Sequence, residues 1–169
     1  MCIRDSASSL LKSCKTQGIH TIVETCGEFS LDRFIEGPYP FLDTIYYDIK
    51  IFDDAAHRTY CGRGNGRILE NFAALYRHSL EGGAGVFPRI PLIPDITDTP
   101  GNIGAIASFL KELGVQKAAL LPYHPLWREK NHHIGIHNPL GEREALKQWQ
   151  DPVRLARCVK ILEEAGIEV

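Results

Sequence analysis

The chain has 169 residues, 44% of them hydrophobic and 24% charged, with a formal net charge of −2. This length and composition are typical of one folded domain with its own core. There is no basic stripe of the kind that binds nucleic acid, no secretory signal pattern, and no apolar run approaching the roughly 20 residues that cross a bilayer. We therefore expect a cytoplasmic protein that binds neither nucleic acid nor membrane.

The first six residues show neither helical nor strand periodicity. We interpret residues 1–6 as an artefact of cloning or sequence assembly and residues 7–169 as the native domain.

From residue 7 the chain alternates between helical and strand patterns. Apolar spacing and capping residues predict helices at 7–17, 31–36, 53–60, 66–79, 100–113 and 151–165. Runs of β-branched and apolar residues predict strands at 19–25, 43–49, 86–93 and 117–123. Residues 124–150 are polar and receive no assignment, and residues 167–169 are expected to add a strand residue or two.

This alternation implies parallel βαβ units and an α/β fold. Four such units make either half of an eight-stranded barrel or an open, doubly wound sheet. The strands are expected to be buried on both faces, as parallel strands usually are. The prolines within 86–93 cannot donate to a sheet ladder, so we expect regular pairing to be only local there.

Five cysteines are spread along the chain, and no two of them are close enough to form a C-x₂-C pair. Their odd number and wide spacing do not indicate a disulfide framework, and no metal or cluster site is encoded by one short loop. We expect reduced thiols that are mostly structural. The cysteines are Cys2, Cys14, Cys26, Cys61 and Cys158.

Polar side chains stand at the end of each predicted strand. They are Glu24 and Thr25 after the first strand, Asp48 and Lys50 after the second, Arg89 within the third, and His124 after the fourth. Each alone has an ordinary alternative, such as a surface ion pair or a hydrogen-bonded histidine. Because active sites of parallel α/β folds lie at the carboxyl ends of the strands, the set predicts a site for a polar, charged ligand.

Two further patterns are weaker. The Gly-Arg-Gly-Asn-Gly run at 62–66 precedes a helix and could cradle a phosphate, but it lacks the G-x-G-x-x-G spacing and a flexible turn is favoured. The histidines His132, His133 and His137 lack the spacing of a zinc pair on a helix, which favours a solvated loop.

Four segments, in order, resemble the activating enzymes of glycyl-radical enzymes, in the radical S-adenosylmethionine superfamily. The segments are CKTQGIHTIVETCG, YYDIKIFDDAAHRTYCGRGNGRILENF, PRIPLIPDITDTPGNIGAIASFL and ALLPYHPL. The resemblance runs from about residue 7 to residue 169 and implies a partial (β/α)₆ TIM-like barrel, of which this chain would supply the last four βα units.

The resemblance also implies which residues contact S-adenosylmethionine. Asp48 and Lys50 would contact its ribose and methionine parts, Arg89 its carboxylate, and His124 its nucleoside part. Glu24 and Thr25, with Asp48, would hold a monovalent cation beside it.

This chain departs from the family at several points. Glu24 stands where some members have Asp, and Asp95 stands where Gly often follows Leu-Ile-Pro. The family's C-x₃-C-x₂-C loop, which holds a [4Fe–4S] cluster, and its Gly-Gly-Glu segment do not occur in these 169 residues. We therefore expect the cluster cysteines to lie upstream of this chain and the chain alone to be inactive.

In the intact protein the implied reaction is reductive cleavage of S-adenosylmethionine, after which a 5′-deoxyadenosyl radical abstracts hydrogen from a glycine of a partner enzyme. The implied partners are a glycyl-radical enzyme and a flavodoxin or ferredoxin-type electron donor. Alternatives are a radical S-adenosylmethionine enzyme acting on a small molecule or a sulfatase, a cluster-free lyase or aldolase with Lys50 as Schiff-base residue, and a module that only binds S-adenosylmethionine.

Overall fold

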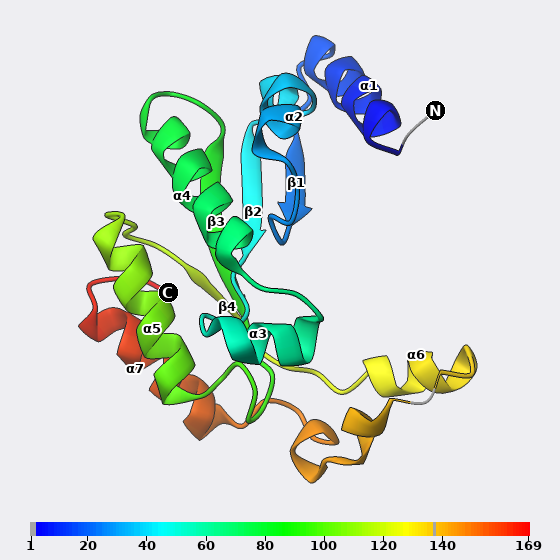
Figure 1. Ribbon diagram of the computed structural model, residues 1–169, viewed down its shortest axis with the longest axis vertical. Helices are drawn as coiled ribbons and strands as arrows, with labels where there is room; N and C mark the ends of the chain where they lie inside the picture. The colour runs from blue at the N-terminus through cyan, green and yellow to red at the C-terminus, as the bar shows by residue number, and fades with distance from the viewer. Residues whose placement is uncertain (1–2, 137) are drawn as a thin grey trace.

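The computed structural model describes residues 3–136 and 138–169 and contains one four-stranded parallel sheet (Figure 1). The strands follow one another in space in their chain order, β1-β2-β3-β4. They are β1 (Ile22–Thr25), β2 (Thr44–Asp48), β3 (Gly85–Pro91) and β4 (Ala119–Leu121). This order without a switch point is that of a half barrel, and the predicted α/β fold is confirmed.

The described residues form seven α-helices and three short 3₁₀ turns. The helices are α1 (Ile3–Thr16), α2 (Leu31–Glu36), α3 (Asp54–Cys61), α4 (Gly66–Leu80), α5 (Pro100–Glu112), α6 (Trp127–His133) and α7 (Pro152–Glu164). The 3₁₀ turns are η1 (Tyr39–Phe41), η2 (Pro139–Glu142) and η3 (Glu144–Leu146). The last two, with α6, occupy the stretch that the sequence left unassigned.

Capping side chains begin three of the helices. Asp53, Thr99 and Asp151 each accept a hydrogen bond from a backbone N–H in the first turn of the helix that follows. Ser30 and Asn65 also occupy N-cap positions, but neither side chain caps its helix. Asn65 instead turns its amide toward the chain before α3.

Helix α1 begins earlier than its pattern predicts. It starts at Ile3 and therefore includes most of the segment in which we expected no helix. Residues 3–6 include no glycine or proline, so nothing in them stops the helix from extending toward the N-terminus. The interpretation of residues 1–6 as an artefact stays a prediction, and residues 1–2 lie outside the described residues.

The sheet is buried on one face, not on both as expected. Alternate side chains of β2 and β3 are fully buried in a core shared with the helices. The side chains between them, including Tyr46 and Phe87, are only half-buried. The reason is that α4, α5 and α7 lie on the same side of the sheet (Figure 1) and supply Phe72, Ile106 and Leu162 to that core.

Strand β3 lies between β2 and β4 despite its two prolines, and its pairing with each neighbour is local, as expected. Gly85 donates to Asp43 of the β2 side, and Leu92 donates to Leu121 of β4, so donors alternate between the two neighbours. By this alternation the backbone nitrogen of Pro88 points to the β4 side. The pairing of β3 with β4 starts only at Arg89, so no β4 partner stands opposite Pro88. The backbone nitrogen of Pro91 points to the β2 side, where the pairing of β3 with β2 has already ended at Arg89. Neither missing N–H removes a ladder bond.

The C-terminal end returns to the sheet as expected. Lys117 and Glu168 form an isolated parallel bridge, and Ala118 donates to the Glu168 carbonyl at 2.9 Å. Within the described residues no helix is both long and apolar enough to span a membrane.

The four described cysteines are free thiols in different environments. Cys158 is fully buried in the core, where burial raises the pKa of its thiol. Cys14 is half-buried, while Cys26 and Cys61 are exposed. The expectation of structural thiols therefore holds for Cys158 and is wrong for Cys26 and Cys61.

Candidate cofactor-binding site

Three of the predicted side chains meet at the carboxyl ends of β1, β2 and β3. The Arg89 guanidinium donates from Nε to Asp48 Oδ1 at 3.0 Å and from Nη2 to Glu24 Oε2 at 2.9 Å. It also lies over the Tyr46 ring, 5.1 Å from its centroid. The meeting follows from the parallel register, which pairs Asp48 directly with Arg89. We call Glu24, Asp48, Lys50 and Arg89 the charged rim.

Electrostatics couple the members of the charged rim. The hydrogen bond and charge of Arg89 hold the pKa of the Glu24 carboxyl below its usual value. The same bond to Glu24, together with Asp48, raises the pKa of Arg89. Lys50 completes the rim, with its Nζ 3.2 Å from Asp48 Oδ2. Two carboxylates and two cations are thus gathered in one connected group of no net charge.

Thr25 is placed differently from Glu24. Consecutive strand residues point to opposite faces of a sheet, and Thr25 Oγ1 accepts a hydrogen bond from the Gly27 N–H at 3.0 Å. The structure therefore joins Thr25 to the turn after β1 and not to the carboxylates of the rim.

The turn after β1 requires a glycine. Gly27 has φ +78°, in the left-handed region that side chains disfavour. A Cβ at this position would overlap the Tyr47 phenol, which is fully buried and donates to the Ile68 carbonyl at 2.6 Å. Close approach to Tyr47 thus explains the glycine of the Glu-Thr-x-Gly segment.

Two asparagines from the helices fix the loops that carry the rim. Asn71 of α4 is buried and donates to the carbonyls of Gly27 and Phe29 at 2.8 and 2.9 Å. Asn102 of α5 donates to the Lys50 carbonyl at 2.9 Å and accepts from the Phe52 N–H. The backbone at both ends of the rim is therefore tied to the helical layer.

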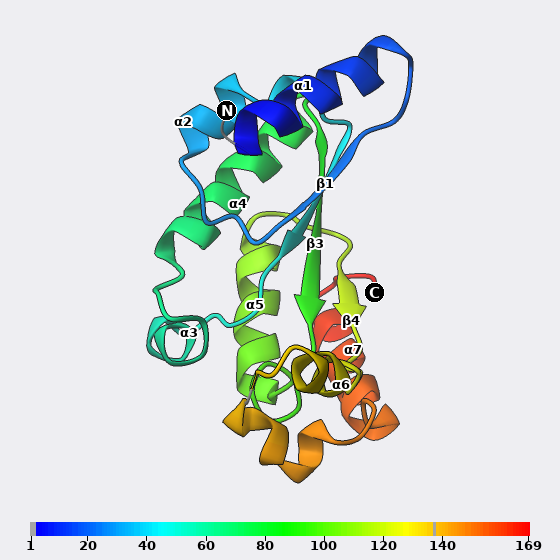
Figure 2. The same cartoon turned by 90° about the vertical axis from the view of Figure 1, so that its right-hand side faces the viewer.

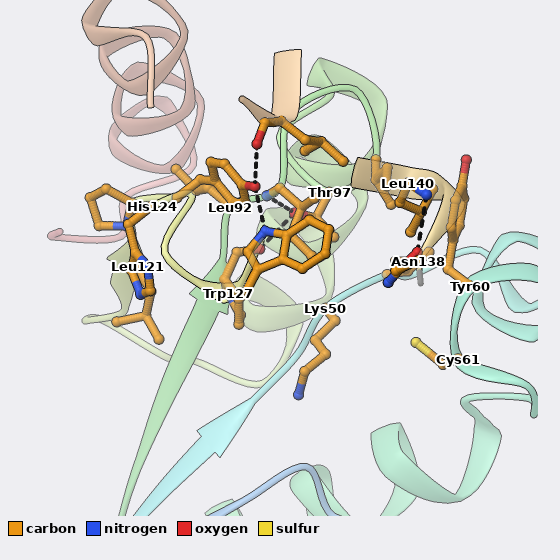
Figure 3. A pocket seen from close by; sticks show the side chains of 17 residues that line it. Lys50, Tyr60, Cys61, Leu92, Thr97, Leu121, His124, Trp127, Asn138 and Leu140 are labelled. Atoms are coloured by element: carbon orange, nitrogen blue, oxygen red, sulfur yellow. Dashed lines mark hydrogen bonds between the residues drawn. The ribbon is translucent and has the colours of Figure 1, made fainter. Parts of the chain in front are cut away.

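A pocket of about 480 Å³ adjoins the rim at the ends of β2, β3 and β4 (Figure 3). Its wall is mainly apolar, with Lys50 and His124 among its polar members. Figure 3 shows His124 and Tyr60 on opposite sides, with Lys50 coming from the end of β2. Figure 2 shows α3 and α6, whose residues contribute to the wall, beyond the carboxyl ends of the strands. The apolar side chains of the wall include Ile51, Leu92, Ile96, Leu121, Trp127, Leu140 and Leu146.

The structure thus brings five of the six predicted residues to one place. Glu24, Asp48, Lys50 and Arg89 form the charged rim, and His124 shares the pocket with Lys50. The sequence did not predict the contributions of Tyr60, Cys61 and Leu140 to the pocket wall. Tyr60 and Cys61 end a helix that was identified without a function, and Leu140 lies in the unassigned stretch.

The loop after β3 explains the unusual residue after Leu-Ile-Pro. Asp95 has φ 62°, the conformation for which glycine is the unstrained residue. Its N–H donates to Asp98 Oδ1 at 2.8 Å, and its carboxylate pairs with Arg154 at 2.7 Å. Asp98 is fully buried and accepts two further bonds from Arg154, at 2.8 and 2.7 Å. The turn therefore has the backbone conformation that glycine would adopt without strain, and the ion pair with Arg154 holds Asp95 in it against α7.

The glycine-rich run before α4 is a turn rich in arginine. Arg63 and Arg67 both pair with Glu28, at 3.5 and 3.2 Å, and Arg58 pairs with Asp54 at 2.7 Å. The three guanidinium groups therefore pair with two carboxylates of this chain, Glu28 and Asp54.

The histidine-rich stretch gives no metal site within the described residues, where no group of three or more potential ligands occurs. His133 is exposed, with Nδ1 2.7 Å from the Glu129 carbonyl. His137 lies outside the described residues.

Fold and rim together define a TIM-like α/β half barrel with a group of charged side chains beside a pocket at the carboxyl ends of its strands. No protein-family model matches the chain. The isethionate sulfite-lyase activating enzyme of Nitratidesulfovibrio vulgaris is 42% identical over 134 residues, which cover 79% of this chain and 42% of that protein. The pyruvate formate-lyase-activating enzyme of Clostridium pasteurianum is 32% identical over 156 residues, which cover 92% of this chain and 61% of that protein.

A solved domain of the pyruvate-formate lyase-activating enzyme from Bacteroides vulgatus superposes with a TM-score of 0.67 at 25% identity, covering 95% of this chain and 85% of that one. The homologues of this chain are thus glycyl-radical enzyme activating enzymes, which confirms the radical S-adenosylmethionine family indicated by the motifs. The chain spans about half the length of the relatives it matches, from 42% to 61% for the two named.

Proposed function

We propose that this chain is the C-terminal, S-adenosylmethionine-binding part of an enzyme that installs a glycyl radical on a partner enzyme. The observation that carries the proposal is the charged rim beside an apolar pocket, on a chain whose homologues are activating enzymes. The cluster cysteines are proposed to lie outside these 169 residues, so that the chain alone is inactive.

The residues present fit S-adenosylmethionine. The methionine part of this molecule carries a carboxylate, an ammonium group and a sulfonium, and a rim with both signs of charge can pair with all three. The nucleoside part is flat and largely apolar, and the pocket offers an apolar wall with a few polar groups.

Each rim residue has a proposed part in holding the cofactor. Arg89 binds the carboxylate, Asp48 and Lys50 bind the ribose and the methionine part, and His124 hydrogen-bonds the nucleoside. Arg89 already holds Glu24 and Asp48 in place, so its guanidinium serves both the protein and the ligand.

Glu24, with Asp48, is proposed to hold a monovalent cation beside the cofactor, whereas the Thr25 side chain points to the opposite face of the sheet and does not share this site. Glu24 suits this role because its side chain is 64% exposed and its lowered pKa keeps it ionised.

Bound beside a reduced [4Fe–4S] cluster, S-adenosylmethionine would take one electron from the cluster, release methionine and supply a 5′-deoxyadenosyl radical able to remove a hydrogen atom from a glycine Cα. This chain's residues bind and orient the cofactor and exclude water from it, and none acts as an acid or base. The electron donor is proposed to be a flavodoxin or ferredoxin-type protein, and the compartment the cytoplasm.

The Schiff-base alternative is disfavoured by the surroundings of Lys50. A Schiff-base lysine is activated in an apolar pocket or beside another cation. Lys50 does line the apolar pocket, but its Nζ is paired with the Asp48 carboxylate at 3.2 Å and not with another cation.

The test is to express the full reading frame at the source locus, reconstitute its cluster without oxygen and reduce it. We expect 5′-deoxyadenosine to form from S-adenosylmethionine, and a glycyl radical signal when the cognate partner is added. A reconstituted, reduced protein that leaves S-adenosylmethionine intact would refute the proposal. Cleavage that yields a modified small molecule or sulfatase and no glycyl radical would favour the alternative radical enzymes.

A further inference from the structure

His124 is carried by backbone that the sheet does not hold. Strand β4 ends at Leu121, whose carbonyl accepts the last ladder bond, from Leu92 at 2.9 Å. The next three residues extend beyond the sheet toward the pocket. A side chain that must meet a ligand needs this backbone to be fixed by something else.

Gln150 supplies that fixation from the segment before α7. Its N–H donates to the Tyr123 carbonyl at 3.1 Å, and its side-chain Oε1 accepts from the Tyr123 N–H at 3.4 Å. One residue thus satisfies both backbone groups of Tyr123, as a neighbouring strand would.

Gln150 is itself held by a buried charge. Its Nε2 donates to Asp98 Oδ2 at 3.3 Å, and Asp98 is fully buried and fixed by Arg154 of α7. The amide cannot rotate without leaving a buried carboxylate oxygen with one bond fewer, which costs free energy. The contacts therefore run unbroken from α7 to the peptide before His124.

The residue before Gln150 touches the histidine ring itself. The Trp149 ring lies 6.2 Å from the His124 ring, centroid to centroid, at 48°. Trp149 is 65% exposed, so this contact alone gives the ring only a partial support. Trp149 thus contacts the ring, while Gln150 fixes the backbone that carries it.

We propose that Gln150 is a positioning residue for His124 in the binding of S-adenosylmethionine, an inference that rests on the proposed function. Gln150 is not among the described side chains that line the pocket, so it acts through His124 and not by touching the ligand. Neither its position in the sequence nor the family motifs mark it for this role.

The test is a double-mutant cycle on S-adenosylmethionine affinity, measured by calorimetric titration well below the unfolding temperature. His124→Ala and Gln150→Ala are each expected to weaken binding about tenfold, the order of one lost hydrogen bond to a polar ligand. The double variant is expected to bind no more weakly than His124→Ala, because Gln150 has no route to the ligand once the imidazole is gone. The exposed Gln148 gives the matched control, and Gln148→Ala should bind as the wild type does.

The outcomes separate the two proposals. Absence of binding by the wild type refutes the proposed function. A wild type that binds, with Gln150→Ala equally tight or with losses that add in the double variant, overturns the positioning role. Hydrogen exchange on the wild type decides the matter if Gln150→Ala fails to fold: the Tyr123 amide must exchange much more slowly than an open loop amide, and fast exchange overturns the inference.

Discussion

Replacing Gly27 by alanine tests whether the turn after β1 is shaped by contact with Tyr47. The new methyl group would overlap the phenol of a fully buried tyrosine whose hydroxyl is bonded to Ile68. Overpacking of a core costs about 1–3 kcal/mol, and the left-handed backbone costs alanine about 1–2 kcal/mol more. We therefore expect Gly27→Ala to lower the free energy of unfolding by about 2–5 kcal/mol.

Gly114 provides the matched control, because it has the same φ of +78° and no atom within 4 Å of its would-be Cβ. Gly114→Ala should lose only the backbone part, about 1–2 kcal/mol. The measurement is urea denaturation of both variants, followed by circular dichroism. Equal losses in the two variants would refute the steric reasoning and leave only backbone strain.

Three further predictions concern charges and strain. Arg154→Ala should lower the free energy of unfolding in urea by about 3–5 kcal/mol, because it leaves the buried Asp98 carboxylate without its cation. The exposed Arg157 is the control, and Arg157→Ala should change the same free energy by under about 0.5 kcal/mol. Equal effects of the two substitutions would contradict this prediction. Asp95→Gly should be about 1 kcal/mol more stable than Asp95→Ala, because both variants lose the ion pair with Arg154 and only glycine removes the backbone strain of the positive φ. Urea unfolding curves that coincide for the two variants would refute this prediction. The Glu24 carboxyl should titrate by NMR below 4.5 and move up toward 4.5 in Arg89→Gln, and an unchanged titration would exclude the rim bond.

The sign of the Glu24 effect on stability follows from linkage. A carboxyl whose native pKa is lowered stabilises the fold above its unfolded pKa, and this contribution is lost as the pH falls through the native pKa. The wild type should therefore melt at a higher temperature than Glu24→Gln at neutral pH, and this difference should disappear only on acidification below about pH 4.5. A stability difference that stays constant to pH 3 would show that Glu24 and Arg89 are not paired.

The sequence predicts the rim well because its geometry depends on one strong rule. Parallel strands end at the same edge, so Glu24, Asp48 and Arg89 had to be neighbours once the strands were recognised. The alternation within a strand, by contrast, separates Thr25 from Glu24, and that detail follows from register and not from motif.

The supports of the rim could not be predicted from sequence. Asn71 contacts a carbonyl 44 residues away and Asn102 one 52 residues away, distances over which no local pattern exists. The pocket wall also includes residues of α6 and η2, whose polar sequence shows neither the helical nor the strand periodicity of apolar residues. The one-sided burial of the sheet likewise depends on where the helices pack, which strand composition does not determine.

Direct titration of this chain with S-adenosylmethionine tests the central claim that the rim and pocket bind this cofactor. The account predicts one binding site, with affinity reduced at least about tenfold by Asp48→Asn and unchanged by Arg157→Ala on the far helix. Failure of the wild type to bind, or binding that Asp48→Asn leaves intact, would contradict it.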